Sequence, residues 1–570
     1  MEQIDLNNLS ISQTELLNDI YDELIDNYHK SIESIYDLLD KKSINWYLST
    51  ILSRNHNLSN LFMNLCYLEL TKIIVKENNI IVVKCRSIDE KKIIKQYFKN
   101  IDNRIEIEYE EKPADKLKRY MAPYIDFLRN IKISLRELYY RDKNRKLNND
   151  KENEIIIIDT FLIQSMFDNG NYYDRYYPGL IDSIDKKTKK KVYFCPTILI
   201  KNGLNNYIDI LKKAKINFIY KFDYLKISDY LIALFMPFFN NKLIKNKIFF
   251  NEFDISKIVR NEYYQKRFHS STFLGILNYL FIKRLKENNI KIILAIDWFE
   301  NQPIDKGFNL GLKKYYPKSE IIGYQGFILS YKYNLHLLPI MKEVSTGLIP
   351  KQICVIGDNL IPIMKKFCTT LDVKSAPAFR FSYLHNNNSL RLNDHQNNYR
   401  ILIALPISIT KSYNIIKFII ELYENIDSMA IRWLIKPHPS LDVNKLKLLI
   451  NKWPEKFELT YEKFSKCISR SSIMIGSTSS TSVEAIAYGV PVIIIESFGC
   501  INQNPIPESI PKTIWDICYT VEGCIDLLNK LLFSADYVFK EDQNKIGKEV
   551  IGGFFKPITN ENVTSFISCN

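Results

Sequence analysis

From residue 154 onward, short apolar runs alternate with helical patterns. The runs are rich in Ile, Leu and Val, and they occupy residues 154–159, 192–194, 217–220, 290–297, 320–327, 353–357, 400–406, 431–436, 457–460, 472–475 and 490–495. Continuous apolar runs of this kind are typical of strands that are buried on both faces of a parallel sheet. Their alternation with helices predicts an α/β fold with two doubly wound, Rossmann-like domains that face a cleft.

The first 150 residues have a different pattern. Residues 1–45 have helical spacing, 71–85 contain two β-rich runs around a turn at 77–79, and 88–99 and 105–109 predict a helix and a strand. A long basic helix is expected over 115–146, followed by a polar linker at 148–153. We therefore expect a helical and small α/β extension over 1–150, a first Rossmann-like (acceptor) domain over 151–369, a linker over 370–398 and a second, donor-binding domain over 399–570. Residues 541–567 are expected to return to the first domain.

A polar turn in the second domain has the residue types of a phosphate site. A short helix is expected from about Val483 to Tyr488, with Gly489 at its C-terminus. Six hydroxyl side chains, at 477–482, lie between the strand at 472–475 and this helix, and five of them are candidate phosphate contacts, namely Ser477, Thr478, Ser479, Ser480 and Thr481. Hydroxyl groups, free N–H groups at a helix start and the positive end of the helix dipole suit a phosphate or diphosphate. A simple helix cap is the alternative explanation.

Three further side chains are expected beside this turn. Glu484 lies in the first turn of the helix, where its carboxylate can accept hydrogen bonds from ribose hydroxyls. Lys436 and His438 leave the carboxyl end of a neighbouring strand, the edge at which open α/β sheets bind ligands. For His438, which lies between two prolines, a purely structural turn residue is the alternative.

These motifs resemble those of known families. Glu484-Ala-Ile-Ala-Tyr-Gly-Val-Pro-Val492 is similar to the E-A-x-A-x-G-x-P-V segment of glycosyltransferases with two Rossmann-like domains, the GT-B architecture. His438-Pro439 together with the hydroxyl cluster resembles bacterial transferases that use CMP-activated acidic sugars, such as sialyl-, polysialyl- and Kdo-transferases of capsule and lipopolysaccharide assembly. The resemblance implies that His438 and the hydroxyl cluster contact the phosphate of the donor.

The first domain supplies candidate catalytic and acceptor residues. Asp159 is expected at the end of its strand, with a cap of the following helix as the alternative role, and the loop at 172–179 offers Arg175 and Tyr177 as sugar contacts. Two segments, 297–307 and 320–327, resemble a mid-chain motif of surface-carbohydrate biosynthesis proteins. They are expected to place Asp297, Glu300 and Gln325 on the cleft-facing edge. The candidates for the catalytic carboxylate are Glu300 first, Asp159 second and Asp297 third.

The amino-acid composition limits which classes of partner and cofactor are expected. A net charge of +14 favours an anionic partner such as a nucleotide, a phospholipid or an acidic glycan. No nucleic-acid-binding motif is present, and the lysines are spread along the chain, so nucleic acid is not an expected partner. No D-x-D pair or C-x-x-C motif occurs, and we expect neither a metal nor another cofactor.

The chain shows neither a signal-peptide pattern nor an apolar run long enough to span a bilayer, which predicts a cytoplasmic protein. Residues 230–250 are apolar and aromatic with interleaved lysines. A core helix that runs into a surface helix explains them; the alternative is a peripheral contact with the inner face of a membrane.

The sequence as a whole predicts a metal-independent glycosyltransferase of surface-polysaccharide assembly. It would move a sugar from a nucleotide-activated donor, with a CMP-activated acidic sugar favoured over UDP- or GDP-sugars, to a glycan or a lipid-linked acceptor. The alternatives are a sugar-nucleotide epimerase of the same fold, a CDP-polyol phosphotransferase and a non-catalytic scaffold.

Overall fold

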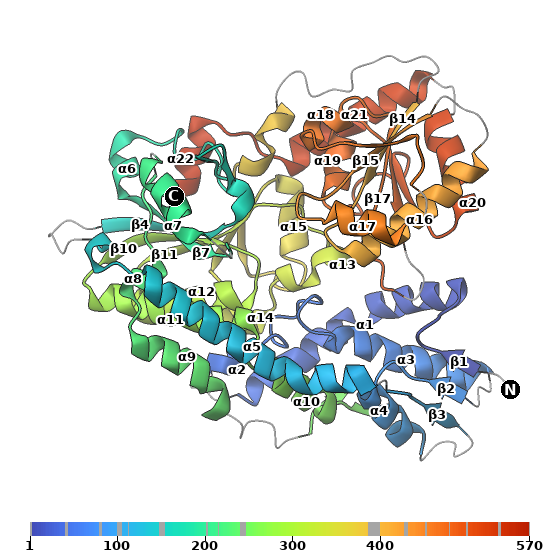
Figure 1. Cartoon of the computed structure of the whole chain (residues 1–570), viewed down its shortest axis with the longest axis horizontal. Helices are drawn as coiled ribbons and strands as arrows, with labels where there is room; N and C mark the ends of the chain where they lie inside the picture. The colour runs from blue at the N-terminus through green and yellow to red at the C-terminus, as the bar shows by residue number, and fades with distance from the viewer. Residues whose placement is uncertain are drawn as a thin grey trace.

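The computed structural model describes residues 3–568 except 40–43, 79–81, 100–104, 112, 148–153, 201–202, 215, 240–246, 386–398, 427–430, 451–452, 478, 497–499 and 534–536. Two six-stranded parallel sheets and one three-stranded parallel sheet organise the chain (Figure 1). Thr478, the expected linker at 148–153 and the second half of the expected linker at 370–398 lie outside the described residues.

The first large sheet has the strand order of a Rossmann-like domain. It runs in the spatial order β13-β12-β11-β10-β4-β7, and Phe218 extends it through a parallel bridge to Phe194 of β7. Numbered along the chain with this bridge as the third member, the order is 3-2-1-4-5-6 plus β13 at the far edge. The strands are β4 (Glu154–Leu162), β7 (Val192–Ile198), β10 (Lys291–Trp298), β11 (Glu320–Gln325), β12 (Gln352–Val355) and β13 (Asp372–Ser375).

The sheet is longer than the sequence predicted. Residues 353–357 were expected to form the last strand of the domain, but β13 pairs with β12 from within the segment expected to be linker. Asp372-Val-Lys-Ser375 lacks a continuous apolar run because it lies at the sheet edge, where two of its side chains are exposed. The first domain therefore extends beyond residue 369.

The second large sheet repeats the Rossmann order. Its strands lie in the order β16-β15-β14-β17-β18-β19, which is again 3-2-1-4-5-6 along the chain. They are β14 (Tyr399–Ala404), β15 (Ile431–Lys436), β16 (Phe457–Leu459), β17 (Ile473–Gly476), β18 (Val492–Ile495) and β19 (Trp515–Cys518). All but β19 were predicted, and the expected α/β fold with two Rossmann-like domains is confirmed.

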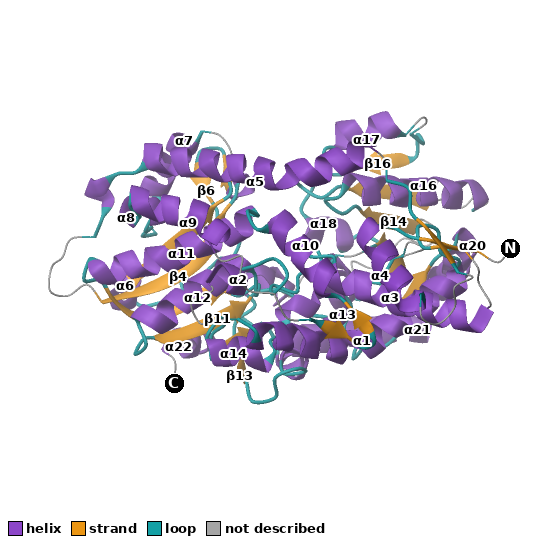
Figure 2. Cartoon of the chain, turned by 90° about the horizontal axis from the view of Figure 1, so that it is seen from below, coloured by secondary structure: helices purple, strands orange, loops and turns teal. Residues whose placement is uncertain are grey.

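Helices cover both faces of the large sheets (Figure 2). In the first domain they are α6 (Lys186–Lys191), α7 (Leu204–Lys213), α8 (Lys221–Tyr224), α9 (Ile227–Phe239), α10 (Ser256–Lys266), α11 (Ser270–Glu287), α12 (Pro303–Tyr315), α13 (Tyr331–Asn334), α14 (Met341–Thr346) and α15 (Ile361–Met364), with the hairpins β5 (Phe167–Asp168)–β6 (Asn171–Tyr172) and β8 (Phe249–Phe250)–β9 (Phe253–Asp254). In the second they are α16 (Ile409–Asn425), α17 (Val443–Leu449), α18 (Phe464–Ile468), α19 (Thr481–Ala487), α20 (Val521–Leu528) and α21 (Tyr537–Phe554), whereas α22 (Asn560–Ser568) packs on the first domain. Among the described helices, none combines the length and apolar content needed to cross a bilayer.

The N-terminal extension is an α/β unit that differs in part from its prediction. Its strands β1 (Gln3–Asp5), β2 (Val82–Lys84) and β3 (Glu106–Glu108) are parallel, and its helices are α1 (Ile11–Asp37), α2 (Ile44–Tyr47), α3 (Leu61–Asn78), α4 (Ile88–Phe98) and α5 (Pro113–Tyr140). The β-rich run predicted from Thr71 is wrong, because these residues continue α3. Burial within the extension outweighs the strand preference of the β-branched residues at 71–75.

A buried ionic cluster joins the extension to the first domain. Arg54 and Lys306 each pair with Glu343 at 2.7 Å, and all three side chains are fully buried. Burial opposes a charge on Glu343, but Arg54 and Lys306 outweigh it and lower the pKa of this carboxyl to about 2. Because breaking a buried ion pair costs about 3–5 kcal/mol, the cluster makes the extension part of one folded unit.

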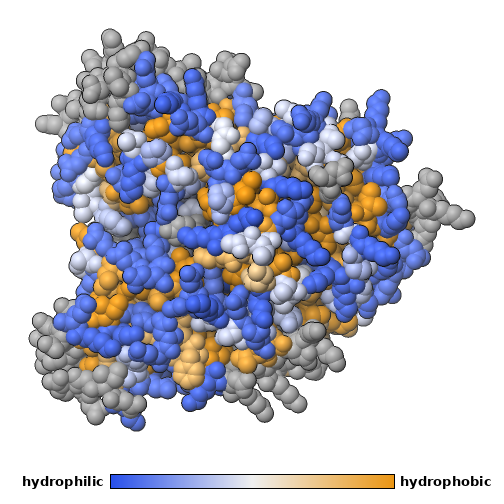
Figure 3. Space-filling model, turned by 180° about the vertical axis from the view of Figure 1, so that it is seen from behind, coloured by the Kyte–Doolittle hydropathy of each residue, from blue (hydrophilic) through white to orange (hydrophobic). Residues whose placement is uncertain are grey.

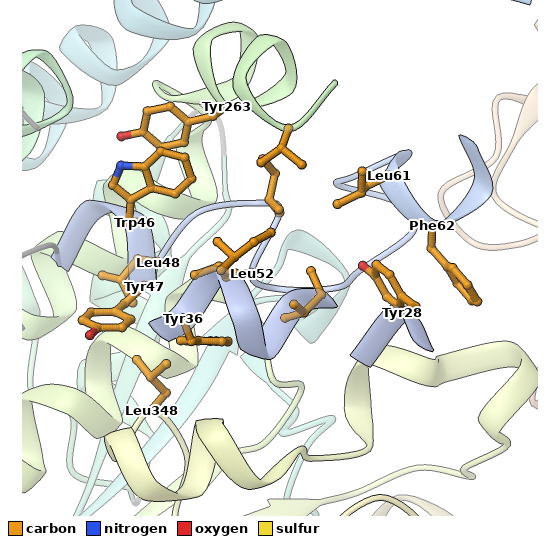
Figure 4. Close-up of a cluster of buried hydrophobic side chains, with 14 of the residues drawn as sticks. Tyr28, Tyr36, Trp46, Tyr47, Leu48, Leu52, Leu61, Phe62, Tyr263 and Leu348 are labelled. Carbon is orange, nitrogen blue, oxygen red and sulfur yellow. The ribbon is translucent and has the colours of Figure 1, made fainter. Parts of the chain in front are cut away.

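Apolar contacts surround this cluster and extend toward the second domain. Figure 4 shows Trp46 stacked on Tyr263, with ring centroids 3.7 Å apart, and Leu348 close to Tyr36 and Tyr47. On the other side of the extension, the backbone N–H of Asn502 donates to the side chain of Asn18 at 2.6 Å. The extension thus contacts both Rossmann-like domains.

The C-terminal segment returns to the first domain, as predicted. The N–H of Lys556 donates to the carbonyl of Ile356 at 2.7 Å, and the Lys556 carbonyl accepts from Ala378 at 2.8 Å. Phe566 of α22 then packs against Tyr324 and Phe379. This crossing places residues 376–385, and η5 (Phe379–His385) in particular, between the two domains.

The variant Gly357→Ala tests the close approach between the C-terminal segment and the first domain. A Cβ at Gly357 would lie 2.3 Å from the backbone carbon of Phe554, so the crossing must open to accept it. We expect a loss of about 1–3 kcal/mol, the usual cost of overpacking, seen as a lower melting temperature. The matched control is Gly552→Ala on the same helix α21, where a Cβ meets nothing within 4 Å. The control should be stabilised by up to about 1 kcal/mol, and equal melting temperatures of the two variants would contradict the close approach.

Candidate functional site

The predicted strand–turn–helix–strand unit forms as expected. β17 ends at Gly476, α19 begins at Thr481, and Gly489 ends the helix with a φ of +70°, a conformation that glycine adopts without strain. The Ser479 and Thr481 hydroxyls hydrogen-bond to each other at 2.8 Å, and the Ser480 side chain makes no capping bond. Ser482 is buried, and its hydroxyl has no partner among the described residues. Ser477 is buried at the end of β17.

Two predicted residues follow β15. The Lys436 ammonium donates to the carbonyl of Glu462, away from the hydroxyl turn. His438 is exposed, and its Nδ1 accepts a hydrogen bond from the N–H of Ser440 at 3.1 Å. This bond fixes the ring and leaves Nε2 directed elsewhere. Partial burial and the nearby Arg175 lower the pKa of His438. Arg175 belongs to the first domain, so His438 faces that domain.

Glu300 is the predicted carboxylate that the structure leaves partly accessible. Its two oxygens accept from the Trp298 indole at 2.8 Å and from the Gln302 amide at 2.6 Å. Asp305 orients the loop, because its carboxylate accepts from the N–H groups of Glu300 and Gln302 at 2.7 and 3.1 Å. Burial raises the pKa of Glu300, while Trp298 and Arg380 oppose the rise. A carboxylate that is fixed in position by hydrogen bonds and has a raised pKa has the properties of a general base.

Arg380 of η5 was not predicted, because its segment was expected to be linker. Its guanidinium lies over the Trp298 ring, 5.9 Å from the centroid. Its charge lowers the pKa values of Glu300 in the first domain and Glu484 in the second, so it lies near both carboxyls. Within the described part of the chain, Arg380 forms neither an ion pair nor a hydrogen bond. The sequence signal that could have identified it is Phe379-Arg-Phe381, an arginine between aromatic residues in a polar stretch.

Arg175 is the second cation of this group. It is exposed, it donates to the Ser165 hydroxyl at 2.6 Å, and partial burial together with Arg380 lowers its pKa. Arg175 is therefore close enough to interact electrostatically with both Arg380 and His438. Like charges gathered in this way repel one another unless an anion lies between them.

Glu484 belongs to the second domain, and its carboxylate already accepts a hydrogen bond. The Tyr383 hydroxyl of η5 donates to its carboxylate. Burial raises the pKa of Glu484 to about 7, and the bond from Tyr383 and the charge of Arg380 keep it from rising further. Tyr383 and Arg380 together tie η5 to α19.

Asp159 and Asp297 are not on a cleft surface, and their expected positions were wrong. Asp159 lies inside β4, which continues to Leu162, and Asp297 lies inside β10; neither is exposed to solvent. Lys221 pairs with Asp159 at 3.3 Å, and Asn309 donates to Asp297 at 2.7 Å. Burial raises the pKa of Asp159 and, with Asp159 beside it, raises that of Asp297 well above its usual range. Both are core carboxyls.

Tyr177 and Gln325 are also buried rather than on a sugar-binding surface. The Tyr177 hydroxyl donates to the Asp159 carbonyl at 3.3 Å, and its ring packs against Trp298 and Tyr324. Gln325 at the end of β11 is fully buried, and its amide has no partner among the described residues. The structure thus brings together Glu300, Arg175, His438 and Glu484 and separates Asp159, Asp297, Tyr177 and Gln325 from them.

No family model and no curated protein matches this chain. Solved structures with similar folds include the calicheamicin glycosyltransferase CalG4 (11% identity over 73% of this chain and 98% of that chain, TM-score 0.41) and MurG of Acinetobacter baumannii (12%, 73% and 99%, TM-score 0.38). Another is the UDP-GlcNAc 2-epimerase of Neisseria meningitidis bound to UDP-GlcNAc (12%, 73% and 99%, TM-score 0.41). Likeness at this level carries no argument for the site, and the fold stated above rests on this chain's own strand order.

The variant Glu484→Gln tests the environment of Glu484 between α19 and η5 through the pH dependence of stability. The folded pKa of about 7 exceeds the ordinary value of 4.5, so the unfolded chain releases this proton at lower pH than the folded chain does. Wild type should therefore lose stability relative to the variant as pH rises from 4.5 to 7, by up to about 3 kcal/mol for a shift of this size. We expect the melting-temperature difference, variant minus wild type, to be larger at pH 8 than at pH 5. The same difference at both pH values would contradict the raised pKa.

Proposed function

We propose that this chain is a glycosyltransferase that uses a nucleotide-activated sugar. The observation that carries the proposal is the meeting of Glu300, held by Trp298 and Gln302, with Arg175, Arg380 and His438 between two Rossmann-like domains. Transfer of a glycosyl group needs a cationic environment for the departing phosphate and a carboxylate near the sugar. In this proposal the first domain supplies Glu300 and Arg175, the second supplies His438, and Arg380 lies between the domains.

Each residue takes one role in this proposal. His438, Arg175 and Arg380 neutralise the phosphate, with Ser477, Thr478, Ser479, Ser480 and Thr481 as additional hydrogen-bond partners and Lys436 at the margin. Glu484 orients the ribose. Glu300 deprotonates the acceptor hydroxyl in an inverting reaction or attacks the sugar in a retaining one.

For the donor we propose a CMP-activated acidic sugar, with UDP- and GDP-sugars as the next candidates. Such a donor carries one phosphate and one sugar carboxylate, and two arginines and one histidine match these two anions. The acceptor would be a surface glycan or a lipid-linked saccharide in polysaccharide assembly, and the reaction would need no metal. An epimerase would convert UDP-GlcNAc without an acceptor, so the nucleotide and the acceptor requirement together separate the two functions.

The proposed function predicts, first, which nucleotide the protein binds. Among CMP, CDP, UDP, GDP and ADP, we expect CMP to raise the melting temperature most; a ligand at a hundredfold excess over its Kd stabilises the folded chain by about 2.7 kcal/mol. His438→Ala and Arg380→Met should lose most of this shift. Arg470→Met, which removes an exposed arginine from the same pair of domains, is the matched control and should keep it. A full CMP shift in both site variants would refute the phosphate site, and a shift with UDP alone would refute the CMP donor.

The proposed function predicts, second, that catalysis depends on the carboxylate of Glu300. Glu300→Gln keeps the size and the bond from Trp298 but removes the base, so we expect an unchanged CMP shift and a loss of about a hundred- to ten-thousandfold in turnover. The measurement is CMP release from CMP-N-acetylneuraminate and CMP-Kdo in the presence of a bacterial membrane extract, with and without EDTA. Turnover equal to that of wild type would exclude Glu300 as the catalytic carboxylate.

A further inference from the structure

Helix α5 has an apolar stripe that nothing in the described structure covers. The stripe recurs every three or four residues, as one face of a helix requires. Its six most exposed members are between 61% and 77% accessible to solvent: Leu117, Tyr120, Tyr124, Leu128, Leu135 and Tyr139. The opposite face is buried through Asn130, Ser134 and Glu137. An exposed stripe of this length on an otherwise packed helix marks a binding surface.

A second apolar stripe lies beside the first. Helix α9 exposes Ile227, Leu231, Phe235 and Phe238 at the same helical spacing. The Phe127 ring of α5 packs against Phe235 and Phe238, with centroids 6.1 and 6.0 Å apart, so the two stripes adjoin. Figure 1 shows α5 running across the front of the molecule. On the opposite face, shown in Figure 3, hydrophobic residues are interspersed with hydrophilic ones.

Basic side chains border this surface. Lys118, Arg129 and Lys132 are exposed and lie on the side of α5 away from α9, and the Arg267 guanidinium lies 5.4 Å from the Phe238 ring centroid. Residues 113–146 carry ten Lys and Arg against four Asp and Glu. Asp115 and Asp126 pair with Lys118 and Arg129, which leaves Lys132 as a cation on this edge that the described ion pairs do not engage.

We propose that the α5–α9 surface docks on a bilayer that contains anionic phospholipid. Apolar and tyrosine side chains would enter the boundary between headgroups and acyl chains, and the lysines and arginines beside them would meet the lipid phosphates. A second copy of this chain would cover the same apolar area but would bring two net-positive segments together, so the charge favours the lipid.

The surface also has a defined relation to the interdomain site. Arg136 of α5 donates to the carbonyl of Ile200 at 2.6 Å, just beyond the carboxyl end of β7. Docking through α5 would therefore bring the carboxyl edge of the first sheet toward the bilayer, where a lipid-linked acceptor would be. The docking itself does not depend on the transfer reaction and can be tested without a sugar donor.

The test is co-sedimentation of the full chain with vesicles. We expect binding to phosphatidylcholine vesicles with about one third phosphatidylglycerol, and little binding to phosphatidylcholine alone. Tyr124→Ser/Leu128→Ser/Leu135→Ser should lower the bound fraction at least about tenfold, because three exposed apolar groups no longer enter the bilayer. Lys118→Glu/Lys132→Glu should lower it while the apolar stripe stays intact. The control is Leu448→Ser, which removes a leucine that is 86% exposed on α17 and should bind as wild type does.

Three results would overturn the proposal: equal binding of wild type to both vesicle types, wild-type binding by the triple variant, or a wild-type dimer in sedimentation velocity that the triple variant dissociates. The last result would assign the surface to self-association. A melting temperature of the triple variant equal to that of wild type shows that the variant is folded, and this control does not depend on the donor site.

Discussion

The crossing of the C-terminal segment between the two domains is the interaction on which the site depends. The backbone of Lys556 bonds to Ile356 at the end of β12 and to Ala378 just before η5, and its ammonium donates to the Ser375 hydroxyl at 3.1 Å. His385, at the other end of η5, contacts the Phe555 carbonyl at 2.8 Å. Without these bonds the short helix between the domains would have few constraints. With them, Arg380 and Tyr383 are held where both sheets present their carboxyl ends.

The acidic residues of the first domain divide into two groups for an electrostatic reason. Asp159 and Asp297 lie on neighbouring strands of the sheet, and burial raises the pKa of both, with Lys221 opposing the rise at Asp159 and Asp159 adding to the rise at Asp297. Glu300 follows β10 in a loop and has two neutral hydrogen-bond donors and a nearby guanidinium. Burial still raises the pKa of Glu300, and these neighbours limit the rise. Carboxyl side chains are thus buried inside the strands and partly accessible two residues after β10 ends.

The extension links these features to the rest of the molecule. Arg54 inserts into the first domain and binds Glu343, while Asn18 contacts Asn502 in the second. The extension is therefore attached to both domains. It also supplies α5, and through that helix the apolar surface on the outside of the chain.

The sequence alone determined those elements that are buried on all sides. Strands buried on both faces must be continuously apolar, which is why β4, β10, β14, β17 and β18 were predictable, and Gly489 marked the end of α19 because few other residues adopt its φ. Sequence also singled out Glu300, His438 and Glu484, since polar residues that follow buried strands lie at the ligand-binding edge of a parallel sheet.

Only the tertiary structure decided which of the candidates meet. Periodicity assigns a residue to a strand but does not say how far the strand continues, so Asp159 was placed at an edge that lies three residues further on. Arg380 lies in a stretch that was predicted to be linker, and the position of this stretch is set by contacts of Ala378 with Lys556 and of Phe379 with Phe566, which are far away in the chain. The ends of α3 and the strand β13 likewise depended on neighbours brought together by folding, whose burial outweighs local preference.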